Sequence, residues 1–169
     1  MFDIITAVDE NNGIGKNNSI PWNLPKDLHH FKMVTMNSCI IMGHNTWKSL
    51  PNKPLPHRTN IIISSTNSLD IDQHSYIVKY NPYRLSCMSN DVIYVFTSLQ
   101  IALDCISSSD CPNIKNTFVI GGGVLYNEAV KHPECNNIYL TRIYKKFDCD
   151  IFFPKVPASF NLVTISKFQ

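Results

Sequence analysis

Long apolar runs, basic clusters and metal-ligand spacings are all missing from this chain of 169 residues. No run of about 18 apolar residues occurs, so no membrane-spanning helix is predicted. The chain begins Met1-Phe2-Asp3, with an acidic residue where a signal peptide needs basic ones. Lys-rich runs are absent and the formal net charge is only +2, which argues against a nucleic-acid-binding face. We therefore expect a cytoplasmic protein with neither nucleic-acid nor membrane partners.

The cysteines and histidines, six of each, also lack the spacing of a metal site. The cysteines at positions 39, 87, 105, 111, 135 and 149 contain no Cys-x-x-Cys pair and no nearby His pattern, which argues against zinc. His29 and His30 are adjacent and so point to different faces of a helix. We expect no metal and reduced thiols. Cys39 lies in an apolar run and is predicted to be a small core residue.

What the sequence does contain is an ordinary globular composition, with 44% hydrophobic and 11% aromatic residues. The length suits a single domain over residues 1–169. Short apolar runs alternate with candidate helices, which indicates an α/β fold. Ile61-Ile62-Ile63 is apolar without alternation, as expected of a strand buried on both faces in a parallel sheet.

Turn signals divide the chain into predicted strands and helices. Strands are predicted at 2–8, 39–42, 60–65, 76–78, 92–96, 118–120, 138–143 and 162–165. Helices are predicted at 25–36, 46–50, 98–107 and 124–131. We therefore expect a mostly parallel central sheet of seven to eight strands flanked by about four helices. Residues 81–90 have weak periodicity and are predicted to form a surface excursion.

The most informative local motif is the segment Pro21-Trp22-Asn23-Leu24-Pro25-Lys26-Asp27-Leu28. Pro25 suits the first helical position, because its φ is fixed and its missing N–H would have no partner there. Asp27 then falls in the first turn, and Phe31 shares its helix face four residues later. A carboxylate beside an aromatic ring is typical of a ligand clamp. The alternative is an exposed Asp27 that only complements the helix dipole.

Two strand–glycine–helix corners are candidates for binding phosphate groups. Gly121-Gly122-Gly123 follows one predicted strand, and Gly43 follows another with Thr46 in the next helix. Helix starts offer unpaired N–H groups and a positive dipole end, and parallel strands bring such corners to one edge of a sheet. Two corners could therefore grip one diphosphate. The glycine triplet lacks the G-x-G-x-x-G spacing, so a bare turn is the alternative. Taken alone, Arg58 is interpreted as a solvated surface residue.

Spaced identities over nearly the whole chain make the sequence resemble dihydrofolate reductase. The matching segments include Ile4-Ile5-Thr6-Ala7-Val8, Gly13-Ile14-Gly15-Lys16-Asn17, Pro21-Trp22, Asp27-Leu28, Ile41-Met42-Gly43-x-x-Thr46-Trp47, Arg58-x-Asn60, Ile120-Gly121-Gly122, Tyr139-Leu140-Thr141-Arg142-Ile143 and Asp150 to Pro154. The resemblance implies the α/β fold of that family. It also implies reduction of 7,8-dihydrofolate to 5,6,7,8-tetrahydrofolate by hydride transfer from NADPH.

The resemblance further implies roles for individual residues. Asp27 would bind the pterin amino group and ring nitrogen, with Thr141 bracing its carboxylate and Trp22 helping to hold an ordered water. Arg58 would pair with the glutamate α-carboxylate of the substrate. The other implied substrate-pocket residues are Ile5, Val8, Leu28, Phe31, Leu50, Leu55, Ile120 and Tyr126. The proton would reach the imine nitrogen through water, because Asp27 would lie at the far edge of the pterin.

The cofactor residues are implied in the same way. Those expected at NADPH are Ala7, Ile14 and Gly15 on the nicotinamide side, Gly43, His44, Asn45, Thr46, Gly121, Gly122, Gly123, Val124 and Leu125 at the phosphates, and Ser64, Ser65 and Thr66 at the adenosine end. Residues 13–20 would form a lid that excludes water, latched by Asp150 from a second loop.

The chain departs from the family pattern in three places. Many members have Arg or Lys at His44-Asn45 and Arg near Ser65, so we expect NADPH to be preferred over NADH by a narrower margin. The excursion at 81–90 is longer than in compact members. The family has one more strand after that predicted at 162–165, so either the chain continues, for instance into the thymidylate synthase domain of some eukaryotic relatives, or it is a truncated piece.

Two other functions fit the same residues. One is a folate- or nucleotide-binding relative with impaired turnover, which the missing strand favours. The other is a related pterin or pyrimidine reductase that uses the same cofactor cleft. Arg58 disfavours the second, because an arginine there is useful only for a substrate with a carboxylate tail.

Overall fold

The computed structural model describes residues 1–66, 77–85, 91–109 and 114–167, which form one seven-stranded sheet and one two-stranded sheet. The order of strands across the large sheet is β5 (Ile77–Tyr80), β6 (Val92–Phe96), β4 (Thr59–Ile63), β3 (Cys39–Gly43), β7 (Thr117–Gly121), β1 (Phe2–Val8) and β8 (Cys135–Arg142). Each neighbouring pair is parallel. The helices are α1 (Pro25–Thr35), α2 (His44–Ser49), α3 (Leu99–Ser107) and α4 (Gly123–Ala129). The predicted α/β fold is confirmed.

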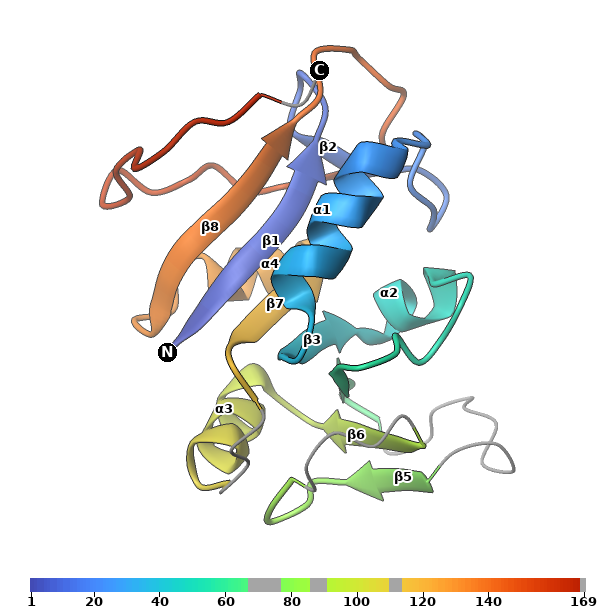
Figure 1. The fold of residues 1–169 in the computed structure, drawn as a ribbon, viewed down its shortest axis with the longest axis vertical. Coiled ribbons are helices and arrows are strands. Elements are labelled where there is room, and N and C mark those ends of the chain that lie inside the picture. The colour runs from blue at the N-terminus through green and yellow to red at the C-terminus, as the bar shows by residue number, and fades with distance from the viewer. Residues whose placement is uncertain (67–76, 86–90, 110–113, 168–169) are drawn as a thin grey trace.

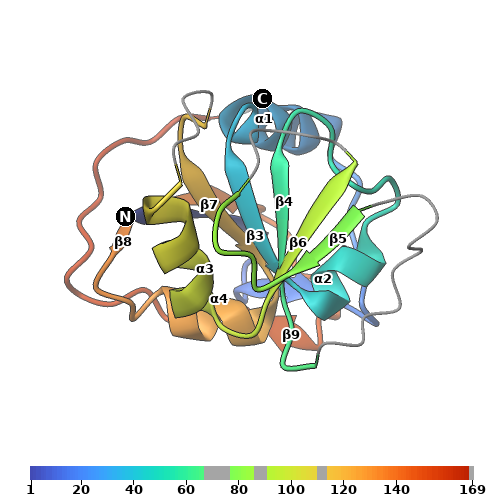
Figure 2. The same cartoon turned by 90° about the horizontal axis from the view of Figure 1, so that it is seen from below.

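Helices cover both faces of the large sheet. In Figure 1, α1 lies in front of β1 and β7, and α4 lies behind them. Figure 2 shows β3 between β7 and β4, with β6 and β5 beyond. Ile41 and Ile61 pack in one apolar cluster with α3 and α4, whereas Ile40 and Ile62 pack in a second cluster with Trp47 of α2. Because alternate residues face opposite sides, Ile40 and Ile41 of β3 and Ile61 and Ile62 of β4 must be apolar on both faces of the sheet.

The helix boundaries follow local signals in the sequence. Pro25 occupies the start of α1, and Asp27 lies in its first turn, as predicted. Ser98 caps α3, since its side chain accepts a hydrogen bond from the N–H of Ile101 at 3.3 Å. The predicted helices agree with the observed ones to within about two residues at each end, which is the usual uncertainty of helix termini.

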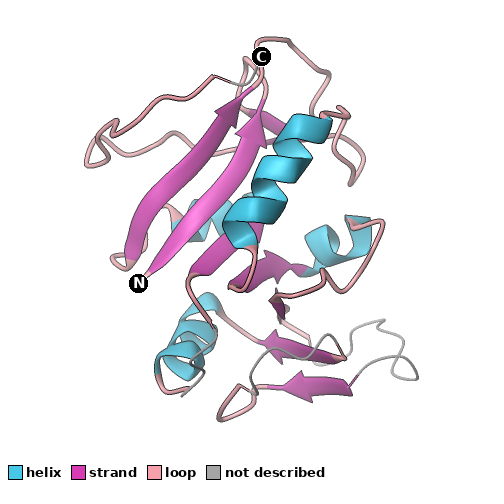
Figure 3. Ribbon diagram, in the orientation of Figure 1, coloured by secondary structure: helices cyan, strands magenta, loops and turns pink. Residues whose placement is uncertain are grey.

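The strand predicted at 162–165 is wrong. Leu162, Val163 and Ile165 are 78%, 87% and 70% exposed, and within the described part of the chain they pair with no strand. Figure 3 shows this segment as loop. A strand requires a neighbouring backbone for its N–H and C=O groups, and an apolar composition does not supply one.

Two other predictions fall partly outside the described residues, namely position 76 of one predicted strand and positions 86–90 of the surface excursion. Within 81–85, Asn81, Tyr83 and Arg84 are exposed, as expected of an excursion, whereas Leu85 is buried in the core. Leu85 therefore attaches the described part of this segment to the core.

The two-stranded sheet was not predicted. It consists of β2 (Gly13–Gly15) and β9 (Ile151–Phe152), which pair antiparallel. Strands of three and two residues are too short to produce an alternation that a sequence can display. This small sheet nevertheless joins the predicted lid to the loop that was expected to latch it.

The cysteines of the described ranges lie as single thiols. Cys39, Cys105, Cys135 and Cys149 form no disulfide, and Cys39 has no exposed surface, which confirms its predicted core position. Across the described ranges, His, Cys, Asp and Glu side chains form no group of three or more that could hold a metal ion. No helix in the same ranges is long and apolar enough to cross a membrane.

The central position of β3 leads to a prediction about stability. Ile41 has no exposed surface, so Ile41→Ala should lower the free energy of unfolding by about 2–5 kcal/mol through lost burial and an unfilled cavity. Ile101→Ala on α3 is the matched control, because Ile101 is 44% exposed and should change stability by about 0.5 kcal/mol or less. Urea unfolding followed by circular dichroism measures both. Equal losses would contradict this account of the core.

Candidate active site

The two glycine corners lie against one another. β3 and β7 are neighbours in the sheet, and Met42 is paired with Gly121. An ideal Cβ built on Gly43 would lie 3.6 Å from the backbone nitrogen of Gly122, and one built on Gly122 would lie 3.1 Å from Oγ1 of Thr46. The corners thus form a single cradle at the carboxyl edge of the sheet, where α2 and α4 begin.

Backbone geometry explains why the cradle is built from glycine. Gly121 has a φ of +139°, which side-chain-bearing residues rarely adopt, and a Cβ there would lie 3.1 Å from Oγ1 of Thr46. Any side chain at Gly121 or Gly122 would therefore fill the space in front of Thr46. An open, backbone-lined surface beside two helix starts fits the diphosphate of a dinucleotide cofactor.

The predicted ligand clamp lies on α1. Figure 1 shows this helix running opposite to β1, so its first turn lies toward the carboxyl edge of the sheet. Asp27 and Phe31 are both half-buried, so part of each side chain can be reached from outside the protein. Thr141 lies on β8, paired with Ala7 of β1, and among the described residues it makes no hydrogen bond with Asp27. The expected bracing of Asp27 by Thr141 therefore stays a prediction.

Arg58 is not the solvated residue that its local sequence suggested. Only 3% of it is exposed, and its Nε donates to the carbonyl oxygen of Pro56 at 3.0 Å while Nη1 donates to Oγ1 of Thr35 at 3.2 Å. Its guanidinium carbon lies 5.9 Å from the centre of the Phe31 ring. Burial lowers the pKa of Arg58 from its usual value. The structure thus joins Arg58 to the helix that carries Asp27.

Asn60 fixes the loop that carries Arg58. Its side-chain Oδ1 accepts from the N–H of Leu55, and its Nδ2 donates to the carbonyl oxygens of Leu55 and Arg58, all at 2.9–3.0 Å. Asn60 has no exposed surface, so these bonds are shielded from water. They hold Leu55 and Arg58 in place before any ligand arrives.

The apolar residues expected to line the substrate pocket, besides Phe31, divide into three groups by burial. Leu50, Leu55 and Ile120 are half-buried and pack against the cluster around Trp47, so the structure brings them together. Leu28 is 53% exposed on α1. The remaining three expected residues are largely or wholly buried: Ile5, Val8 and Tyr126.

Val8 and Tyr126 are placed as structural residues. Val8 packs in the cluster of α3 and α4 and faces away from Ile5, because residues three apart in a strand point to opposite faces. The Tyr126 hydroxyl donates to the carbonyl oxygen of Ile5 at 2.9 Å, and burial raises the pKa of Tyr126. Both side chains are therefore buried in the core, with 0% of Val8 and 4% of Tyr126 exposed.

The other expected cofactor residues vary widely in exposure. Those that are half-buried are Ala7, Ile14, Gly15, His44 and Gly123. Those that are exposed are Asn45, Ser65, Thr66 and Val124. Leu125 is buried in the core beneath α4, and Ser64 is buried with its hydroxyl donating to the carbonyl oxygen of Thr66 at 3.1 Å.

The predicted lid is held down by the loop that carries β9. The carboxylate of Asp150 accepts from the N–H of Asn17 at 2.9 Å, and the N–H of Asp150 donates to the carbonyl oxygen of Gly15 at 3.0 Å. Lys16 forms a 2.7 Å ion pair with Asp148, which raises the pKa of Lys16. The latch expected at Asp150 is therefore present in the structure.

Two contacts that the sequence did not indicate join the lid and the neighbouring Trp22 to the same loop. The rings of Trp22 and Phe147 have centroids 5.2 Å apart. An ideal Cβ on Gly13 would lie only 2.5 Å from both Cβ and Sγ of Cys149, so the two segments touch backbone to side chain. Phe147 and Cys149 stand in a loop without periodicity, so no sequence pattern could have identified them.

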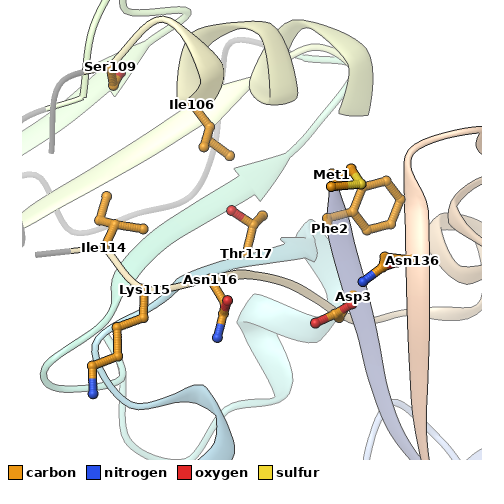
Figure 4. A pocket seen from close by; sticks show the side chains of 10 residues that line it. All are labelled: Met1, Phe2, Asp3, Ile106, Ser109, Ile114, Lys115, Asn116, Thr117 and Asn136. Atoms are coloured by element: carbon orange, nitrogen blue, oxygen red, sulfur yellow. The ribbon is translucent and has the colours of Figure 1, made fainter. Parts of the chain in front are cut away.

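Two hollows on the surface lie away from these residues. One, of about 360 Å³, opens at the amino ends of β1 and β7, the opposite edge of the sheet from the glycine cradle (Figure 4). Its lining residues are Met1, Phe2, Asp3, Ile106, Ser109, Ile114, Lys115, Asn116, Thr117 and Asn136. The other, of about 420 Å³, is lined by Pro25, Lys26, His29, His30 and Met33 of α1 alone. Neither contains a predicted site residue, so the site is assigned from the convergence of side chains at the carboxyl edge.

Comparison with known proteins agrees with this geometry. A family model described as dihydrofolate reductase matches residues 1–169. Dihydrofolate reductase of Heliothis virescens is 36% identical over 172 residues, covering 96% of this chain and 84% of the relative. The enzyme of the same name from Aedes albopictus is 35% identical over 172 residues, covering 96% and 83%.

A second type of relative is much longer than this chain. The bifunctional dihydrofolate reductase-thymidylate synthase of Daucus carota is 33% identical over 168 residues, which cover 94% of this chain but only 29% of the relative. The chain therefore spans less than a third of the length of such bifunctional proteins. On the family model, the relatives and the shared architecture, this chain belongs to the dihydrofolate reductase family.

Proposed function

We propose that this chain reduces 7,8-dihydrofolate to 5,6,7,8-tetrahydrofolate with NADPH as the cofactor. The observation that carries the proposal is the meeting of the Gly43 and Gly121–Gly122 corners at the sheet edge toward which the first turn of α1 points. A dinucleotide held in that cradle would run toward Asp27. The names of the relatives support dihydrofolate as the substrate.

Each part of the chain has a defined task in this reaction. NADPH, when bound, supplies the hydride. Asp27 would accept hydrogen bonds from the pterin amino group and ring nitrogen and so fix the ring against Phe31. The guanidinium of Arg58, already oriented by Pro56 and Thr35, would hold the glutamate α-carboxylate of the substrate.

The lid and water complete the proposed mechanism. Residues 13–20, held by Asp148 and Asp150, would exclude bulk water from the space where hydride is transferred. Since Asp27 would bind the pterin edge far from the imine nitrogen, the proton would reach that nitrogen through a water near Trp22. Asp27 would orient and polarise the ring and would not itself donate the proton.

The first test of this mechanism is the variant Asp27→Asn. An asparagine keeps the shape but loses the charge, so kcat/KM at neutral pH should fall by about 100-fold or more. The measurement is the loss of NADPH absorbance after dihydrofolate is added. The control is Asp104→Asn on α3, whose Oδ1 accepts from Gln100 and lies outside the site. An unchanged rate in Asp27→Asn would refute the role assigned to this carboxylate.

The second test concerns the choice between NADPH and NADH. The phosphate corner contains His44 and Asn45 in place of a permanent cation, so we expect NADPH to be preferred by a small factor. Replacing His44 with arginine should widen the ratio of the two kcat/KM values by about tenfold, equivalent to about 1.4 kcal/mol. Equal kcat/KM for NADPH and NADH in the wild-type chain would contradict the preference.

A folate-binding relative without turnover is the alternative, and the same absorbance assay separates it from an enzyme. Such a relative would bind dihydrofolate and NADPH but leave the absorbance unchanged. A cytoplasmic location and an association with a thymidylate synthase domain stay predictions from the sequence and its bifunctional relatives.

A further inference from the structure

Asp9 is an ionisable residue with no exposed surface, placed directly after β1 at the base of the lid. Its Oδ1 accepts hydrogen bonds from the N–H groups of Asn11 at 2.8 Å and Gly13 at 2.7 Å. Its Oδ2 accepts from the N–H of Phe147 at 2.9 Å. The two oxygens of one carboxylate therefore bind two segments that are far apart in the sequence.

The segment bound by Oδ2 is the loop that holds the lid and touches the site. Directly after Phe147, the side chains of Asp148 and Asp150 hold Lys16 and Asn17 of the lid. The Phe147 ring packs on Trp22 with 5.2 Å between the ring centroids, and Nζ of Lys145 also lies over the Phe147 ring, 5.2 Å from its centroid. Displacement of the Phe147 backbone would therefore move both the lid contacts and the indole.

The charge state of Asp9 suits this arrangement. Burial by itself would raise the pKa of Asp9, but the N–H groups of Phe147, Gly13 and Asn11 outweigh burial and hold the pKa below its usual value. Sγ of Cys149 lies 3.9 Å from Oδ2 of Asp9. Burial and the charge of Asp9 raise the pKa of the Cys149 thiol, so this neighbour of Asp9 is neutral. An ionised carboxylate accepts at both oxygens and donates at neither.

We propose that Asp9 is a positioning residue for hydride transfer, which sets the lid and the Trp22 indole by tying Gly13 and Phe147 to one carboxylate. The proposal rests on the proposed reductase function for its kinetic consequences. Its structural consequence, a fixed environment for Trp22, does not depend on that function.

Asparagine at position 9 would affect differently the hydrogen bonds made by the two carboxylate oxygens of Asp9. Its carbonyl oxygen can replace Oδ1 toward Asn11 and Gly13, but its NH₂ group would then face the N–H of Phe147, and two donors repel. Asp9→Asn should therefore release the Phe147 loop while keeping the size of the side chain. Small displacements of this kind slow a chemical step by about 10- to 100-fold.

The experiment measures two properties of Asp9→Asn under conditions where circular dichroism shows it folded. Single-turnover loss of NADPH absorbance with saturating dihydrofolate should be about 10- to 100-fold slower than in the wild type, with little change in the KM for dihydrofolate. In protein labelled with 5-fluorotryptophan, the ¹⁹F resonance of Trp22 should shift, whereas that of the buried Trp47 should stay.

Asp3→Asn is the matched control. Asp3 lies near the other end of β1, and its Oδ1 also accepts a backbone N–H, that of Asn137, at 3.0 Å. This variant disturbs the same strand and the same kind of bond at a distance from the lid, so both readouts should match the wild type. Equal slowing in Asp3→Asn and Asp9→Asn would overturn the proposal, because the effect would then be general destabilisation.

A second variant covers the case in which Asp9→Asn does not fold. Phe147→Leu keeps the backbone N–H that Asp9 accepts and removes the ring from Trp22, so it should also shift the Trp22 resonance and slow hydride transfer. If the folded variants have the same rate of NADPH loss and the same Trp22 resonance as the wild type, the proposal is overturned. If the wild-type chain itself fails to oxidise NADPH, the proposed function fails, and the Trp22 resonance still decides whether Asp9 sets the indole.

Discussion

The parallel pairing of β3 with β7 is the contact on which the rest of the site depends. These strands come from distant parts of the chain, and their register places Met42 opposite Gly121, so that their terminal glycines, Gly43 and Gly121, lie within one residue of the same level. A shift by one residue would turn every buried side chain of a strand to the other face. The apolar residues on both faces of β3 therefore fix the register, and the register brings the two corners into contact.

The two sides of the site are held by different means. The cradle lies at the ends of strands in the middle of the sheet, whose neighbouring side chains have no exposed surface. It can therefore open only if the core itself opens. The lid is held by a short two-stranded sheet, one exposed ion pair and a few hydrogen bonds to a second loop. Local opening costs least where such contacts are few, so the lid can open while the cradle stays formed.

Periodicity and turn chemistry predicted the sheet, the helices and both glycine corners, because each of these depends on neighbours in the sequence. The strand expected at 162–165 failed, since pairing requires a partner that composition does not reveal. Arg58 also could not be interpreted locally, because its burial comes from the distant Thr35 and Phe31. Asp9 gave no motif beyond an acid two residues before Asn-Asn-Gly, and its partner Phe147 is contributed by a loop near the other end of the chain.

The close approach of Gly13 to Cys149 has a consequence for sequence change in this family. Because there is no room for a Cβ at position 13 while a side chain fills position 149, the two positions share one volume. A relative that acquires a side chain at the first position is expected to have glycine at the second, and the reverse. The pair should therefore covary, and a single exchange at either site should be tolerated poorly until the other follows.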